Sequence, residues 1–222
     1  MSKLIREIRK SVFYINTGIK AGTGFFIDEQ GLAVTCCHVV ENASKTIIPE
    51  GNAYVLEPNS VHYKPAKFKV KKTERANDLA IIEVEQGPFE RLRLDGDFAE
   101  RIAGEEIAIF GFPFVPYLNH PSLTKGVISA IFTDPQNELD MIQTDAWIYE
   151  ASSGSPVFLV KNGIVIGYAT SSFDPFAEHT RELKRKGIEV RVDFAGRPYK
   201  EYTNVCFVVP SKYIQKLMER SA

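Results

Sequence analysis

The sequence has few cysteines and no long apolar runs, and its charges almost cancel. Its three cysteines are Cys36, Cys37 and Cys206, and an odd number with one adjacent pair argues against a disulfide framework. No run approaches the roughly 20 apolar residues of a membrane-spanning helix. The net charge of −1 disfavours nucleic acid or an anionic membrane as the main partner. The basic N-terminal stretch lacks the apolar core and cleavage site of a secretory signal, so we expect a cytoplasmic protein with reduced thiols.

Spacings typical of metal sites are also missing. The three cysteines and four histidines form no CxxC or HxxxH pattern, so we expect no metal and no cofactor. His62, His120 and His179 have polar or proline-rich neighbours and are interpreted as surface residues. The composition, 44% apolar and 25% charged, is typical of a globular protein with a sizeable core.

The sequence is rich in short runs of β-branched and aromatic residues separated by Gly, Pro, Asn or Asp. This pattern predicts an all-β sandwich or paired barrels, and periodicity alone does not choose between them. The Asn162-Gly163 pair predicts a hairpin. Helices are expected at 3–9, 176–186 and 211–220, the last with Ser211 as its N-cap. Strands are expected at 12–16, 24–27, 32–35, 45–48, 53–56, 67–71, 79–84, 106–110, 122–132, 141–144, 157–160, 164–171, 188–192 and 205–209.

Three separate stretches carry residues suited to nucleophilic catalysis. His38 follows an apolar run in GLAVTCCHVVENA, Asp78 precedes one in RANDLAIIEVE, and Ser153 lies in the small-residue stretch EASSGSPVF. Taken singly, each has a plain structural reading: a packed histidine, a turn aspartate and a flexible turn. Together they offer a nucleophile, a base and a carboxylate that orients the base.

These stretches resemble trypsin-like serine proteases, most closely those of the HtrA/Deg type. GTGFFIDEQGLAVTCCHVVENA, NDLAIIEV, GEEIAIFGFPF, LTKGVISAI, MIQTDAWIYEASSGSPVF, GIVIGYATSS and CFVVPSKYIQKL occur in the order of the family's motifs and cover nearly the whole chain. The resemblance implies two six-stranded antiparallel β-barrels followed by a C-terminal helix. It implies one peptidase domain over 1–222, with barrels at about 11–90 and 98–210 and the helix at 211–220.

The resemblance also assigns roles. His38, Asp78 and Ser153 match the catalytic triad, and the backbone N–H groups of Ala151 and Ser153 match the oxyanion hole. The side chains expected beside the first specificity pocket are those of Ile148, Tyr149, Tyr168, Ala169 and Thr170. No acidic residue occupies the expected pocket base, which favours a small or medium apolar substrate side chain.

Several positions depart from the family pattern. Ala151 and Ser155 replace glycines, and alanine at 151 predicts either a strained residue of positive φ or a flipped peptide that spoils the oxyanion hole. Cys36 and Cys37 replace polar residues and are interpreted as small buried side chains. The segment 174–204 is an insertion, either a solvated helix and hairpin or a lid or docking surface beside the cleft. The sequence ends at Ala222 after the last predicted helix, so we expect no PDZ module.

The leading hypothesis is a serine endopeptidase that acts on peptides or unfolded proteins through an acyl-enzyme intermediate. The alternative is a protease-fold binding module that is inactive or only conditionally active, as Ala151 and the charged insertion would allow. An oligomer is compatible with either hypothesis.

Overall fold

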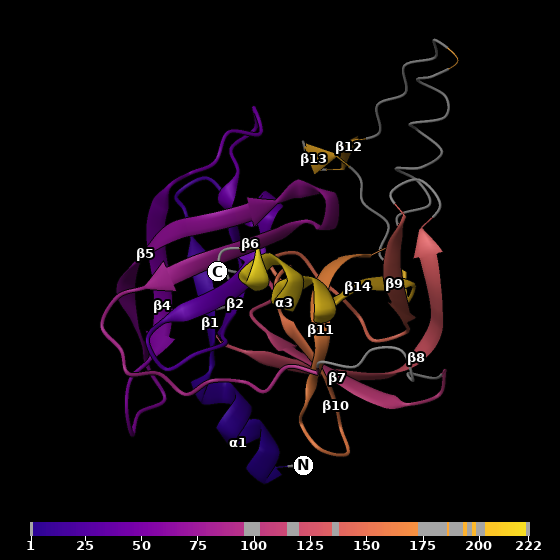
Figure 1. Ribbon diagram of the computed structural model, residues 1–222, viewed down its shortest axis with the longest axis horizontal. Coiled ribbons are helices and arrows are strands. Elements are labelled where there is room, and N and C mark those ends of the chain that lie inside the picture. Colours follow the sequence, from indigo (N-terminus) through magenta and orange to yellow (C-terminus); the bar gives the residue numbers. More distant parts are fainter. Residues whose placement is uncertain are drawn as a thin grey trace.

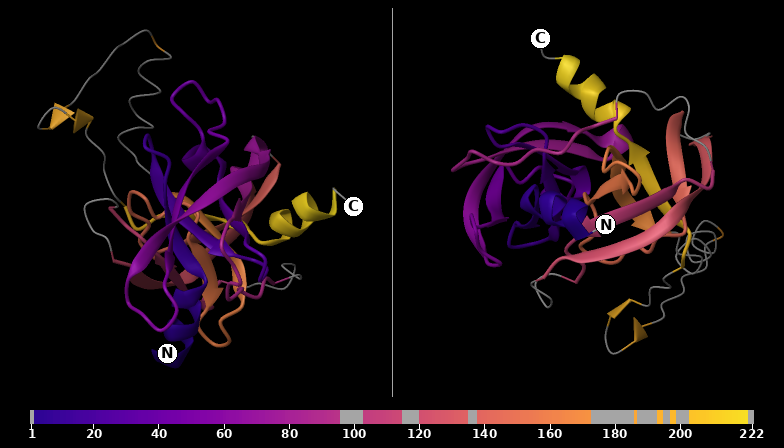
Figure 2. Two further views of the ribbon diagram at one scale, coloured as in Figure 1. Left: turned by 90° about the vertical axis from the view of Figure 1, so that its left-hand side faces the viewer. Right: turned by 90° about the horizontal axis from the view of Figure 1, so that it is seen from below.

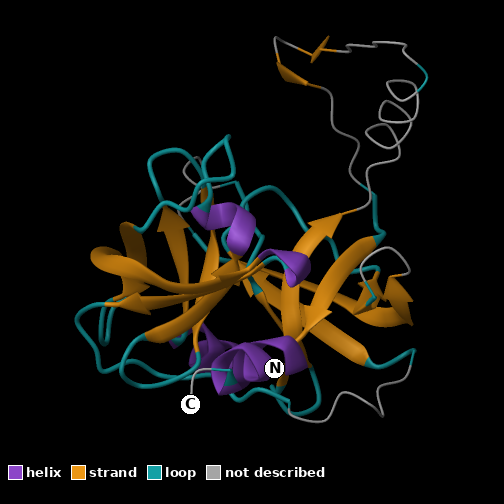
Figure 3. Cartoon of the chain, turned by 45° about the horizontal axis from the view of Figure 1, so that its top comes forward, coloured by secondary structure: helices purple, strands orange, loops and turns teal. Residues whose placement is uncertain are grey.

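Strands dominate the computed structural model and close into two antiparallel barrels that lie side by side (Figures 1 and 3). Both barrels have six strands, which confirms the predicted double barrel with a C-terminal helix. The structure describes residues 2–95, 103–114, 120–134, 138–172, 186, 193–194, 197–198 and 203–220.

The first barrel has the strand order β1-β2-β3-β6-β5-β4. Strand β6 is a nearly continuous apolar run with five of its six residues buried, whereas β5 alternates between buried and exposed positions along its N-terminal half. Such patterns are typical of fully and half-covered strands, respectively. The strands are β1 (Val12–Asn16), β2 (Ala21–Phe26), β3 (Leu32–Cys36), β4 (Glu50–Leu56), β5 (Tyr63–Glu74) and β6 (Leu79–Val84).

The second barrel has the order β10-β11-β14-β9-β8-β7. The hairpin predicted at Asn162-Gly163 joins β10 to β11, and Gly163 takes the positive φ of 73° that such a turn favours. The strands are β7 (Glu106–Gly111), β8 (Ser122–Asp134), β9 (Leu139–Thr144), β10 (Pro156–Leu159), β11 (Val165–Ser172) and β14 (Cys206–Pro210).

Within the described residues, two α-helices flank the barrels on different sides, as Figure 2 shows. Helix α1 (Ser2–Lys10) packs Ile8, and helix α3 (Lys212–Glu219) packs Ile214 and Leu217, into the core shared by the barrels. Ser211 is the N-cap residue of α3, as expected, but its side chain does not cap the helix. Its hydroxyl makes no cap bond and donates instead to the carbonyl of Asp95, 2.9 Å away.

The larger hydrophobic cluster continues from the first barrel into β7, β10 and β11 of the second. Tyr168 of β11 is completely buried in this cluster, and its hydroxyl donates to the carbonyl of Asn77, which lies just before β6. Burial of apolar surface across the seam therefore fixes the two barrels together, and the residues at the seam are held on both sides.

Some predicted elements differ from the structure. No strand forms at 45–48, because the Asn42 side chain accepts the N–H groups of Ser44 and Thr46 and makes a turn there; a single bridge pairs Glu41 with Ile47. The helix expected at 176–186, apart from Lys186, and the strand expected at 188–192 lie outside the described residues. Of the insertion, the structure describes Lys186, Thr203, Asn204 and two short paired strands, β12 (Asp193–Phe194) and β13 (Arg197–Pro198). Within the described ranges, no helix has the length and apolar character needed to cross a membrane.

Candidate active site

His38 and Asp78 are joined by two hydrogen bonds at one edge of the first barrel. The Nδ1 atom of His38 lies 2.6 Å from Oδ2 of Asp78, and the His38 backbone N–H donates to Oδ1 over 2.9 Å. His38 is positioned by a 3₁₀ turn, η1 (Cys37–Val40), directly after β3, and the N–H of Cys37 donates to the Asp78 carbonyl. Side chain and backbone of the histidine are thus both held by one aspartate, which leaves the other ring nitrogen for chemistry.

Asp78 follows a second 3₁₀ turn, η2 (Arg75–Asn77), and has left-handed backbone angles, φ 53° and ψ 40°. Aspartate tolerates this conformation better than most residues. Burial raises the pKa of Asp78, but hydrogen bonds and charge from His38, together with the Thr170 hydroxyl, outweigh burial and hold the pKa below its ordinary value. The carboxylate is therefore ionised near neutral pH and can accept both hydrogen bonds from His38.

Thr170 of β11 connects this pair to Ser153. Its hydroxyl donates to Oδ2 of Asp78 over 2.8 Å, and its carbonyl accepts the Ser153 hydroxyl over 3.1 Å. The three residues predicted as a triad thus lie in one hydrogen-bond network that spans both barrels. Within the part of the chain that the structure describes, no hydrogen bond joins Ser153 to His38 directly.

The turn that carries Ser153, residues 150–155, is called the nucleophile turn after the role predicted for Ser153. It has two residues of positive φ: Ala151 at 65° and Gly154 at 87°. A Cβ atom on Gly154 would lie 2.2 Å from the carbonyl oxygen of Thr23, so only glycine fits there. Of the two conformations expected for Ala151, the strained residue of positive φ is the one observed, and the peptide is not flipped. No acceptor among the described residues takes the N–H of Ala151 or of Ser153. Two unpaired amides on one turn are what an oxyanion hole requires.

The residues predicted to line the specificity pocket divide into two groups. Ile148, Tyr168 and Ala169 are buried, with Tyr168 at 0% exposure, whereas Tyr149 and Thr170 are partly exposed. Tyr149 stacks against Trp147, with ring centroids 5.8 Å apart, and Trp147 is 41% exposed. Aromatic rings with exposed surface therefore lie directly before the nucleophile turn in the chain.

Cys36 packs behind this site. Its Sγ atom, a ring nitrogen of His38 and a carboxylate oxygen of Asp78 lie within 4.8 Å of one another, a donor set that zinc also accepts. However, burial holds the pKa of Cys36 well above its ordinary value, and His38 is already hydrogen-bonded to Asp78. The Cys36 thiol would have to lose its proton before a cation could bind.

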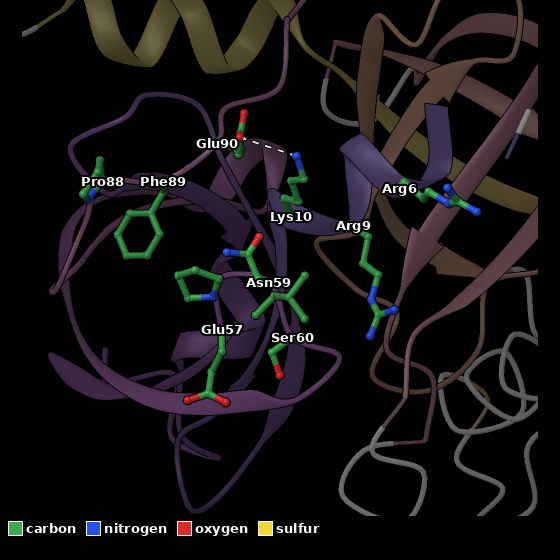
Figure 4. A pocket seen from close by; sticks show the side chains of 11 residues that line it. Arg6, Arg9, Lys10, Glu57, Asn59, Ser60, Pro88, Phe89 and Glu90 are labelled. Carbon is green, nitrogen blue, oxygen red and sulfur yellow. Dashed lines mark ion pairs between the residues drawn. The ribbon is translucent and has the colours of Figure 1, made fainter. Parts of the chain in front are cut away.

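A separate cavity of about 450 Å³ lies against helix α1, and Figure 4 shows its side chains. Lys10 of α1 pairs with Glu90 there, 3.7 Å away, while Pro88, Phe89 and Pro58 supply apolar surface. None of the predicted site residues lines this cavity.

Comparison with known proteins shows the family to which this fold belongs. Residues 22–167 match the family described as a trypsin-like peptidase domain. The chain belongs to this family. This trypsin-like peptidase domain is 33% identical over 154 residues to a probable periplasmic serine endoprotease DegP-like protein of Halomonas elongata, covering 68% of this chain and 29% of that protein. It is 29% identical over 174 residues to serine protease HTRA1B of Danio rerio, covering 75% of this chain and 33% of that protein.

The trypsin-like peptidase domain also resembles the crystal structure of Deg5, with a TM-score of 0.72 and 20% identity over 97% of this chain and 90% of that chain. The relatives identify an HtrA-type protease domain, and the structural likeness shows the shared fold. The chain spans about a third of the length of the curated relatives it matches.

Two functional features were not predicted from the sequence. Thr170 was expected beside the substrate, but its hydroxyl also contacts Asp78. Thr23 was not singled out, although its hydroxyl donates to the Ala151 carbonyl over 3.1 Å. Both contacts cross from one barrel to the other, and no local sequence pattern marks such contacts.

Proposed function

We propose that the trypsin-like peptidase domain is an active serine endopeptidase that cleaves peptides or unfolded proteins. The observation that carries the proposal is the hydrogen-bond network in which Thr170 links the Asp78–His38 pair to the Ser153 hydroxyl. Family membership supports it, because the relatives are named serine proteases and endoproteases.

In the proposed reaction, Ser153 attacks the carbonyl carbon of the scissile bond while the free ring nitrogen of His38 accepts the serine proton. Asp78 holds the histidine tautomer and stabilises the imidazolium. The N–H groups of Ala151 and Ser153 bind the oxyanion, and donors fixed in this way contribute about 3–4 kcal/mol each to transition-state stabilisation. His38 then protonates the leaving amine, and water releases the acyl group by the same steps.

The Ser153 hydroxyl must first leave the Thr170 carbonyl. A backbone N–H of a bound substrate competes for that carbonyl and so favours rotation of the hydroxyl toward His38. Binding and activation of the nucleophile are coupled in this scheme. A side chain of small or medium size is preferred at the cleavage site, because apolar Ile148 and Ala169 lie where the pocket is expected.

A binding module without turnover is the second candidate. It is favoured by the same contact, since a hydroxyl that stays on Thr170 never attacks.

Incubation with unfolded casein separates the two candidates. We expect fragments from the wild-type chain and none from Ser153→Ala, whereas Ser155→Ala, altered on the same turn but outside the triad, should still cut. Intact casein in every reaction, with Ser153→Ala binding casein as well as wild type does, would favour the binding module.

A further inference from the structure

Thr23, in the middle of β2, contacts the nucleophile turn more extensively than its place in the first barrel requires. Its N–H donates to the carbonyl of Ser153 over 2.9 Å, and its hydroxyl donates to the carbonyl of Ala151 over 3.1 Å. The same hydroxyl accepts the N–H of Phe112 over 3.0 Å. Thr23 is fully buried, so none of these bonds competes with solvent.

The direction of the hydroxyl bond follows from proton counting. A threonine hydroxyl has one proton and can also accept. The Phe112 N–H can only donate, so the oxygen of Thr23 accepts from Phe112 and its proton goes to the Ala151 carbonyl. The bond that holds Ala151 therefore has a fixed direction and lies in a buried site.

Ala151 needs such a bond because of its backbone. Its φ is 65°, in the left-handed region, which an alanine populates about 5–30-fold less than its ordinary conformations. Rotation of the peptides on either side of Ala151 would relieve this strain. It would also turn the Ala151 carbonyl away from Thr23 and move the N–H that the oxyanion needs.

We propose that Thr23 is a positioning residue that holds Ala151 in the oxyanion-binding conformation. This inference rests on the proposed function for its effect on turnover, but the structural coupling of Thr23 to Ala151 stands apart from it. The β-branched side chain of Thr23 favours the strand. Its hydroxyl stabilises the positive φ of Ala151, which a glycine at 151 would adopt without such a bond.

The test compares Thr23→Val, which has the same shape but no hydroxyl, with Thr23→Ser, which keeps the hydroxyl. Thr144→Val is the matched control, because Thr144 is equally buried and its hydroxyl accepts one N–H, from Ala146, without contacting the turn. With a peptide substrate, we expect Thr23→Val to lower kcat by about 10–100-fold and to leave KM within about twofold, as loss of a transition-state contact does. Thr23→Ser should recover most of kcat, and Thr144→Val should change it by less than about threefold.

The same substitution made on an Ala151→Gly background gives the sharper result. Because glycine adopts positive φ readily, the effect of Thr23→Val on kcat should shrink by about fivefold there. An equal effect on both backgrounds, or a Thr23→Ser variant as slow as Thr23→Val, would overturn the proposal. Should Thr23→Val not fold, as judged by circular dichroism, Thr23→Ala replaces it in the same comparisons.

Urea unfolding can be measured without any activity on four proteins: wild type, Thr23→Val, Ala151→Gly and the double variant. We expect the two substitutions to be non-additive, with Ala151→Gly reducing the loss caused by Thr23→Val. Additive changes would refute the positioning role even in an active enzyme. If the wild-type chain cleaves no substrate while the cycle shows coupling, the proposed function fails and the link between Thr23 and Ala151 is retained.

Discussion

The hydroxyl of Ser155, two residues after Ser153, is completely buried and has no hydrogen-bond partner among the described residues. A buried polar group without a partner costs about 1–3 kcal/mol in desolvation. Ser155→Ala removes that cost. The void left by one oxygen atom destabilises the fold by only a few tenths of a kcal/mol, at about 24 cal/mol per Å³. We therefore expect the variant to be more stable by about 1–2 kcal/mol, since the desolvation cost exceeds the void cost.

Ser211 offers a control with the same substitution and the same complete burial. Its hydroxyl donates to the carbonyl of Asp95 and makes no helix-cap bond. Ser211→Ala should therefore destabilise by about 1 kcal/mol, through loss of one satisfied hydrogen bond. The two serine-to-alanine changes should have opposite signs.

Urea titration and thermal unfolding of wild type and both variants measure this difference. A stabilisation of 1–2 kcal/mol corresponds to a rise in melting temperature of roughly 2–8 °C for a chain of this size. Loss of stability in Ser155→Ala equal to that in Ser211→Ala would show that the Ser155 hydroxyl is well bonded in solution. The reasoning from burial at this turn would then be refuted.

Three further predictions concern the same region. Gly154→Ala should destabilise the fold by more than about 2 kcal/mol, because backbone strain at φ 87° adds to a clash with Thr23. Gly18→Ala, at φ 82° with nothing within 4 Å, should cost only about 1 kcal/mol, so equal urea midpoints for the two variants would contradict this prediction. Burial, followed by a hydrogen bond to Glu41, raises the pKa of Cys37 from 9.0 to about 12. The folded state therefore keeps a proton that the unfolded chain loses, so the free energy of unfolding should fall above pH 9, by about 2 kcal/mol at pH 10.5. Cys37→Ala should remove this dependence on pH in urea titrations, and an unchanged dependence would show that other groups cause it. Asp78→Asn should lower kcat by about 10⁴-fold in a peptide assay with the fold intact, because it favours the wrong histidine tautomer; a loss below tenfold would exclude a triad role.

The double barrel was predictable because local patterns report strands and turns directly. The Asn162-Gly163 hairpin and the apolar run of β6 formed as expected. The strand predicted at 45–48 was wrong because Asn42 supplies a side-chain acceptor that replaces ladder bonds, which the apolar pattern does not show. Sandwich and barrel could be distinguished only by family resemblance, since closure depends on strand pairing across the whole sheet.

The candidate site was predictable as a set of residues but not as a network. His38, Asp78 and Ser153 were selected by motif, and the structure brings them together. The contacts that orient them, from Thr170 to Asp78 and from Thr23 to Ala151, join residues 92 and 128 positions apart in the chain. Any threonine in a strand looks the same in the sequence, so these contacts required the structure.

The central claim is that Ser153 is a nucleophile activated by His38. Labelling with a fluorophosphonate probe, followed by peptide mass spectrometry, tests it most directly. We predict a single modified residue, Ser153, in the wild-type chain, and labelling slowed by several orders of magnitude in folded His38→Ala. Modification of other residues only, or labelling of Ser153 at an equal rate in His38→Ala, would contradict the account.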